Sequence, residues 1–287
     1  MKDMNYGFDE YIRDTVPDRS LRYQSWKIAI GFQKMEGLTV SPYLMETAGK
    51  HIEGKIDFTT AKQRIDSYHK THGESTDTIE ADMVSVRIVE ILCEKAFSLR
   101  PQELISIHER LFTSIYDHAG KFRNCNVTKH EWVLDGYTFP YASYETLAST
   151  LDDLFREERS FSYDISLSEA SRHIASFISG IWQIHPFAEG NGKTVAIFLI
   201  KYLQYLGFDM DSDVFAEHSS YFRNALVRAA YQNRKKGICR NTVYLELFFD
   251  NLLFGATHGL KNRRLHVNYG ISVNVSVRDD FPFGDFN

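Results

Sequence analysis

The chain has 287 residues, and 43% of them are hydrophobic, which is enough for one sizeable core, or for one core with a smaller appended subdomain. A formal net charge of -5 argues against a non-specific nucleic-acid binder. Its three widely spaced cysteines include no Cys-x-x-Cys pair, which argues against a disulfide framework or a structural zinc site. The N-terminal residues do not resemble a signal peptide and no apolar run is long enough to span a bilayer, so we expect a soluble, cytoplasmic protein with neither a membrane nor a nucleic-acid partner.

The first part of the chain, residues 1–73, is predicted to form a helical subdomain. The helical spacing of its first apolar residues ends at Gly37, a residue type that commonly follows the last turn of a helix. Ser41 before Pro42 is typical of the N-cap and first position of a second helix, and Asp57 precedes a third. The predicted helices span residues 20–36, 43–52 and 57–69.

The rest of the chain is predicted to be mostly helical, so the expected fold class is all-α with one small β-hairpin. The hairpin is expected within residues 121–141, around the turn pair Asp135-Gly136. A capping sequence from Ser166 to Glu169 opens the helix that ends before His185. In the tail, residues 265–287, alternating apolar residues predict a terminal strand over 267–277. The further predicted helices span residues 78–99, 103–115, 144–158, 166–184, 193–206, 219–233 and 242–260.

A ten-residue loop between two apolar helices, residues 185–194, predicts a phosphate site. The segment Gly190-Asn191-Gly192 allows a backbone that points several N–H groups inward. The helix expected from Lys193 onward directs the positive end of its dipole at the same place. Lys193 adds a charge and the Thr194 hydroxyl adds a donor, so an anion would be held here.

Two further side chains of this loop supply a metal ligand and a base. Glu189 offers an oxygen to a hard cation such as Mg²⁺, which commonly arrives bound to phosphates. His185 is a base with an ordinary pKa of about 6.5. Base, anion site and metal ligand together predict transfer of a phosphate-containing group to a hydroxyl. Gly192-Lys193-Thr194 ends like a P-loop, but Phe187 stands where a P-loop has glycine and a helix precedes the loop, so we reject that interpretation.

The loop resembles the signature of the Fic family, which is His-x-Phe-x-(Asp/Glu)-Gly-Asn-Gly-(Arg/Lys)-x-x-Arg between two helices. The residues Gly120 to Arg123 and the hairpin after them resemble the target-docking flap of that family, and Tyr221 to Arg228 resemble the helix after its active site. The resemblance extends over residues 78–264, which we treat as the Fic domain. The signature residues that match are His185, Phe187, Glu189, Gly190, Asn191 and Gly192.

Members of this family typically transfer AMP from ATP to a Ser, Thr or Tyr hydroxyl of a target protein. The resemblance implies that His185 deprotonates the target hydroxyl and that Glu189 holds Mg²⁺ at the α- and β-phosphates. The phosphate ligands that it implies are Gly190, Asn191, Gly192, Lys193 and Thr194.

The flap, residues 128–137, is expected to hold a segment of the target protein by strand addition. ATP and a protein with an accessible hydroxyl are therefore the expected partners, and the sequence leaves homo-oligomerisation open. The flap residues expected to dock the target are Thr128, Lys129, His130, Glu131 and Trp132.

Two positions depart from the family pattern. Lys193 keeps the charge of the usual arginine but loses its bidentate fork. Ala196 stands where a second arginine grips the γ-phosphate, and one lost charge-assisted contact costs on the order of 1.5–3 kcal/mol. Three interpretations stay open: a weakened or autoinhibited adenylyltransferase, an enzyme that uses another phosphate-containing donor, and a catalytically silent nucleotide-binding or scaffolding protein.

The first helix carries a candidate regulatory residue. Glu36-Gly37 resembles the inhibitory pattern (Ser/Thr)-x-x-x-Glu-(Gly/Asn), whose glutamate pairs with the second loop arginine, and the three-helix layout resembles a small antitoxin fused ahead of its Fic domain. Phe32 stands at the Ser/Thr position, and Ala196 removes the usual partner of the glutamate. Both roles of Glu36 stay open, an inhibitor that faces Lys193 and a plain helix-end residue before a glycine cap.

Other residues carry weaker signals. The ten histidines besides His185 show no metal spacing and are expected on the surface or in the core. Arg123 suits a functional role and a structural role at the start of the hairpin equally well. Tyr221, Asn224 and Arg228 share one helical face, where they either approach the nucleotide base or pack and pair.

Overall fold

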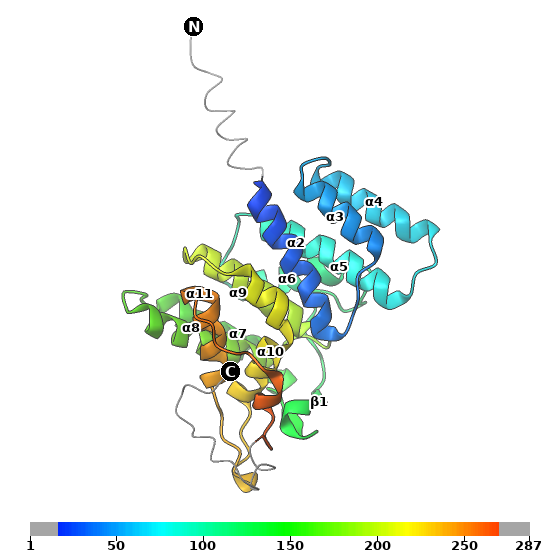
Figure 1. Ribbon diagram of the computed structural model, residues 1–287. Helices are drawn as coiled ribbons and strands as arrows, with labels where there is room; N and C mark the ends of the chain where they lie inside the picture. Colours follow the sequence, from blue (N-terminus) through cyan, green and yellow to red (C-terminus); the bar gives the residue numbers. More distant parts are fainter. Residues whose placement is uncertain (1–16, 270–287) are drawn as a thin grey trace, which may run out of the picture. The chain divides into compact units, whose positions relative to one another are not determined.

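The computed structural model describes residues 17–269. The described residues divide into two compact units, 17–95 and 96–269. Figure 1 labels their helices and the hairpin. The described residues form ten α-helices and one two-stranded antiparallel hairpin, which confirms the predicted fold class. Within the same residues no helix combines the length and apolar character needed to cross a membrane.

Residues 17–95 of the first unit form four α-helices. Side chains of Asp18, Ser41, Asp57 and Ser75 each accept a hydrogen bond from a backbone N–H three residues further on, so every one of these helices begins at a capped residue. α2 packs along α5, and α3 packs on α4. The helices are α2 (Arg19–Gln33), α3 (Pro42–Ile52), α4 (Phe58–Thr71) and α5 (Thr76–Cys93).

The helix α5 belongs to the first unit, although the sequence analysis grouped it with the segment that follows. Its buried face includes Ala81, Val84 and Ile88, and α2 and α4 both pack on this helix. Fully buried Asp82 ties the unit together because its carboxylate accepts from the Ser41 backbone N–H at 2.8 Å and lies 2.9 Å from His69 Nε2. The predicted limits of the Fic domain, residues 78–264, therefore remain a proposal.

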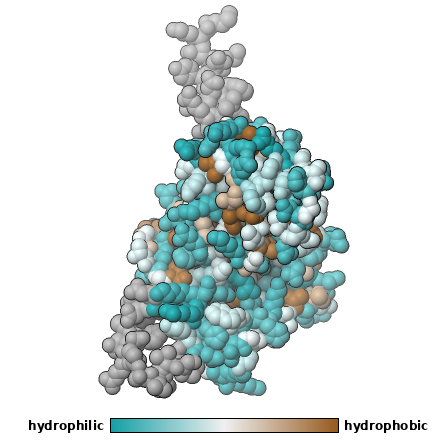
Figure 2. Space-filling model, turned by 45° about the vertical axis from the view of Figure 1, so that its right-hand side comes forward, coloured by the Kyte–Doolittle hydropathy of each residue, from teal (hydrophilic) through white to brown (hydrophobic). Residues whose placement is uncertain are grey.

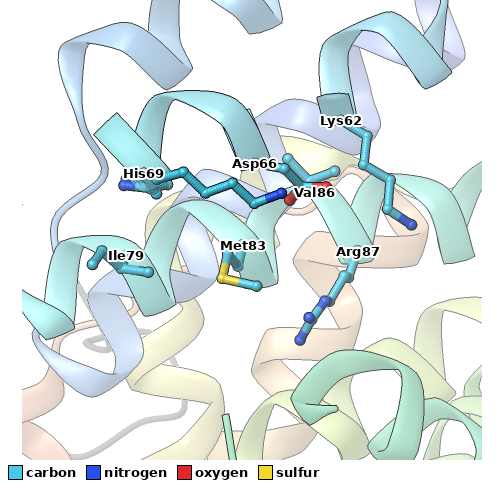
Figure 3. Close-up of a pocket in the computed structure, with 8 residues that line it drawn as sticks. Lys62, Asp66, His69, Ile79, Met83, Val86 and Arg87 are labelled. Carbon is cyan, nitrogen blue, oxygen red and sulfur yellow. The ribbon is translucent and has the colours of Figure 1, made fainter. Parts of the chain in front are cut away.

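A cavity of about 410 Å³ lies between α4 and α5. Apolar side chains and side chains of both charges line it together (Figure 3). Positively charged Lys62 pairs with Glu90 at 3.6 Å, and Asp66 acts electrostatically on Arg87. The charges around this cavity are thus largely compensated.

The second unit is built around α8, which packs on α7, α9, α10 and α11. The predicted capping box is present, since Ser166 and Glu169 bond each other's backbone N–H groups at the start of α8. α10 begins seven residues before the predicted position because it continues through a kink at His218. The helices are α6 (Pro101–Phe112), α7 (Leu147–Ser160), α8 (Leu167–Ile184), α9 (Asn191–Tyr205), α10 (Ser212–Ala230) and α11 (Val243–Phe254).

The hairpin pairs β1 (Thr128–His130) with β2 (Thr138–Pro140), with Lys129 opposite Phe139. Asp135 and Gly136 adopt the left-handed conformation expected of them, but they close a longer connection rather than a two-residue turn. The fully buried Val133 and Leu134 hold this connection against the core as a short 3-10 turn. Of the predicted tail strand, residues 267–269 form a turn and the remainder lies outside the described residues.

On the face drawn in Figure 2, hydrophilic residues predominate and hydrophobic ones form small patches. Single exposed apolar side chains are normal for a folded protein. Trp132 on the hairpin connection is 56% exposed, which is high for the largest side chain. An exposed tryptophan on a hairpin suits a docking surface.

Candidate active site

The loop between α8 and α9 takes its shape from two residues in the left-handed conformation. His185 caps the C-terminus of α8 with φ 52°, and Gly190 caps the N-terminus of α9 with φ 74°. A Cβ atom added at Gly190 would lie within 2.7 Å of Phe112 Cζ. Only glycine satisfies both demands, a left-handed backbone and close approach to α6.

The Arg123 side chain holds the start of the loop, where α8 ends. Arg123 is 5% exposed, and its backbone N–H donates to the Pro186 carbonyl at 2.9 Å. Of the two roles considered for this residue, the structure shows the structural one, because the guanidinium is occupied by main-chain oxygens. These acceptors are the carbonyls of His185 at 2.8 Å, Cys125 at 2.7 Å, Ile184 at 3.2 Å and Ala142.

His108 of α6 fixes the other side of the loop, a role that the sequence analysis missed. Its Nδ1 accepts from the Gly120 N–H at 2.9 Å, so its Nε2 carries the proton and donates to the Glu189 carbonyl at 3.1 Å. The ring stacks on Phe187 at 3.8 Å, and burial lowers the pKa of His108 to about 4. The only feature of the sequence that points to this role is the i, i+4 spacing, which places His108 and Phe112 on one face of the helix.

The His185 ring is buried and stacks on Tyr141, with centroids 3.7 Å apart, while Trp182 meets its edge at 5.2 Å. Among the described residues neither ring nitrogen forms a hydrogen bond of ordinary geometry, and the Trp182 carbonyl is near enough to favour the protonated ring weakly. Burial, with the charge of Lys129 adding to it, lowers the pKa of His185 well below its ordinary value. The imidazole is therefore neutral near pH 7, and two unpaired buried nitrogens are rare enough to indicate a functional group.

The hairpin and the loop meet at an ion pair. Lys129 Nζ lies 3.3 Å from Glu189 Oε2, and the Glu189 side chain is 58% exposed. The structure thus brings together two predicted site residues that are sixty positions apart in the chain. Residues 17–269 contain no cluster of three or more His, Cys, Asp or Glu side chains able to hold a metal, so Glu189 belongs to none.

Two polar side chains that are predicted to bind phosphate form hydrogen bonds within the loop. The Asn191 amide donates to the Phe187 carbonyl at 2.7 Å and accepts from its N–H at 3.0 Å. The Thr194 hydroxyl donates to the Gly190 carbonyl at 2.9 Å, and the Lys193 side chain is 1% exposed. The anion donors that the geometry favours are therefore the backbone N–H groups in the first turn of α9, which lack intrahelical acceptors.

One predicted docking residue of the hairpin is not available to a partner. Glu131 is 1% exposed and forms a two-point ion pair with Arg223 of α10, at 2.8 and 3.0 Å. This pair holds the hairpin on α10. Thr128, His130 and Trp132 are exposed as expected of docking residues.

The face of α10 considered for the nucleotide base packs and pairs in the structure. Tyr221 is 2% exposed, Asn224 donates to the Asn262 side chain at 2.7 Å, and Arg228 donates to the Leu265 carbonyl at 2.6 Å. These contacts tie α10 to the segment after α11.

The comparisons with known proteins point to one family. Residues 98–203 match the Fic/DOC family. The chain is similar to protein adenylyltransferase VbhT of Bartonella schoenbuchensis, 26% identical over 193 residues, which are 63% of this chain and 35% of that protein. It is also similar to probable protein adenylyltransferase y4lH of Sinorhizobium fredii, 28% identical over 129 residues, 43% of this chain and 62% of that protein. The chain thus spans less than two thirds of the length of each relative.

Two solved structures share the fold. One is a Fic family protein from Desulfovibrio desulfuricans G20, with a TM-score of 0.51, 15% identity, and coverage of 94% of this chain and 70% of that one. The other is a Fic domain containing signaling protein from Bacteroides thetaiotaomicron, with a TM-score of 0.51, 17% identity, and coverage of 80% and 82%. At these identities the likeness supports the architecture alone.

Proposed function

We propose that this chain, a Fic/DOC family protein whose match covers residues 98–203, transfers AMP from ATP to a hydroxyl of a target protein. The names of its two relatives, both adenylyltransferases, support this assignment. The observation that carries it is the His185 imidazole, buried and neutral, with both nitrogens unpartnered within the described residues, in the loop that leads into α9.

In the proposed reaction the hydroxyl oxygen of the target attacks the α-phosphorus of ATP. The hydroxyl proton passes to His185, the bond from the α-phosphorus to the bridging oxygen breaks, and pyrophosphate leaves. Backbone N–H groups in the first turn of α9 would stabilise the charge on the α-phosphate. The low pKa of His185 keeps it ready to accept a proton, and the negative charge of a bound donor would raise its basicity.

Glu189 suits a Mg²⁺ ion that arrives with the donor, because its carboxylate is exposed beside the N-terminus of α9. Such an ion would supply positive charge to the phosphates. The Mg²⁺ ion would also compete with Lys129 for the Glu189 carboxylate. The Lys129 ammonium would then be free to approach the same phosphates. We propose Lys129 as the cation that makes up in part for the charge missing at Ala196, since Arg123 and Arg223 are held in other bonds.

Regulation by the first unit is a second element of the proposal. Glu36 is exposed in the turn Lys34–Glu36, directly before left-handed Gly37, as an inhibitory glutamate would be. We propose that Glu36 limits access of the donor to the loop. Glu36→Gly should then raise the affinity for ATP in calorimetry severalfold, and an affinity equal to that of the wild type would leave Glu36 as a plain helix-end residue.

The test of AMP transfer uses two labels. The protein is incubated with Mg²⁺ and ATP labelled at the α-phosphate or at the γ-phosphate, with itself and with cell extract as acceptors. AMP transfer predicts protein-bound label from α-labelled ATP alone, and its loss in His185→Asn, a substitution that tolerates the left-handed backbone at this position. Protein-bound label from γ-labelled ATP would contradict the proposal and show phosphoryl transfer.

A silent nucleotide-binding protein is the second candidate, favoured by Ala196 and by the buried side chain of Lys193. It predicts that ATP binds without incorporation of either label. Incorporation of the α-label separates the two functions. Calorimetry on the same samples is the control for binding, because His185→Asn should leave ATP affinity nearly unchanged in both cases.

A further inference from the structure

A cavity of about 370 Å³ lies beside the hairpin and is lined by three cations. Its walls include Tyr137 of the hairpin connection, Arg228 of α10, and the loop 236–241 with Lys236 and Arg240. No aspartate or glutamate from residues 17–269 lines it. The mixed charges of the cavity between α4 and α5 are absent here, so this cavity has a strong preference for an anion.

The three cations have no acidic partner within the part of the chain that the structure describes. Lys236 lies over the Tyr137 ring at 3.5 Å, and Arg240 donates to the Gln183 side chain at 3.5 Å. Arg228 is 8% exposed, contacts the Leu265 carbonyl and the Tyr244 ring, and keeps an Nε without a hydrogen-bond partner. Burial of a guanidinium without a carboxylate partner costs desolvation free energy, and a bound anion would offset that cost.

The backbone around the cavity is fixed rather than loose. Asn233 and Ile238 form a β-bridge, and left-handed Gly237 closes the turn between them. The Asn241 N–H donates to the Arg228 carbonyl at 2.9 Å, which joins the loop to α10. These bonds fix the backbone that carries the exposed side chains of Lys236 and Arg240, and a fixed backbone lowers the entropy cost of binding.

The cavity adjoins the elements proposed to handle the target protein. Tyr137 directly precedes β2, and Gln183, which Arg240 contacts, lies two residues before His185. We propose that this cavity receives a carboxylate side chain of the protein segment docked on the hairpin, so that targets carry an acidic residue near the modified hydroxyl. This inference rests on the proposed function for the identity of the partner.

The test measures peptide binding without nucleotide, by fluorescence anisotropy at low ionic strength. The probes are a labelled peptide with glutamates on both sides of a tyrosine and its glutamine analogue. The test variant is Lys236→Ala with Arg240→Ala. The matched control is Arg234→Ala with Lys235→Ala, which removes two exposed cations of the same segment that do not line the cavity.

The expected result is an affinity for the glutamate peptide that falls about tenfold in the test variant and stays within twofold of wild type in the control. Equal losses in both variants, or equal binding of the two peptides by the wild type, would overturn the proposal. ATP affinity of the same variants is measured separately by calorimetry. A test variant that loses ATP affinity and keeps the peptide affinity of the wild type would assign the anion to the donor and overturn the proposal. A severalfold gain of peptide affinity in Asp279→Asn with Asp280→Asn would assign the cavity to the chain's own C-terminal residues. Absence of AMP transfer would defeat the proposed function and leave this binding result standing.

Discussion

Replacing His108 by glutamine should change how stability depends on pH. In the folded protein the pKa of His108 is about 4, because the buried ring is kept neutral, whereas in the unfolded chain it is about 6.5. Below pH 6.5 the unfolded chain therefore binds more protons, and the folded state loses stability as the pH falls toward 4. The full loss is about 3 kcal/mol, and at pH 5 it is about 2 kcal/mol.

His108→Gln removes this titration and keeps a donor for the Glu189 carbonyl. The free energy of unfolding is measured by urea titration at pH 7.5 and pH 5, followed by tryptophan fluorescence. The wild type should lose about 2 kcal/mol more stability than the variant across this interval. Equal losses in the wild type and His108→Gln would refute the assignment of a buried, neutral His108.

Three further substitutions test the loop. Gly190→Ala should destabilise the protein by more than about 1 kcal/mol in urea titration, and by more than Gly207→Ala, which has the same left-handed backbone but open space around it. Lys129→Ala should weaken Mg²⁺–ATP binding about tenfold in calorimetry while adenosine binding is unchanged, with exposed Lys121→Ala as control. Arg123→Lys should lower the melting temperature and the transfer rate together, because one ammonium cannot serve four carbonyls; unchanged values would remove its positioning role.

Much of the local structure was predictable because it depends on neighbours in sequence. The caps at Ser41, Asp57 and Ser166 work through hydrogen bonds that span three residues. Predictions failed where distant contacts decide. The packing of α5 on α2 and α4, which groups this helix with the first unit, could not be read from the sequence.

The site shows the same division. That His185, Glu189 and Gly190 share one loop could be seen in the sequence, but the roles of the side chains near them could not. The sequence predicts Glu131 as a docking residue. In the structure an ion pair with Arg223, 92 positions away, holds its side chain in the protein interior. The hydrogen bond that joins the Asn191 amide to the Phe187 carbonyl could not be read from the sequence, and a role of Asn191 in phosphate binding stays a prediction.

The sequence by itself determined the helices, their caps and the loop that carries the base, since backbone propensity, capping and glycine conformations act over a few residues. Only the tertiary structure decided that His108 and Arg123 hold that loop, that Lys129 meets Glu189, and that three cations surround one cavity. The physical reason is that burial and charge compensation depend on which distant segments meet, and a linear pattern does not contain that information.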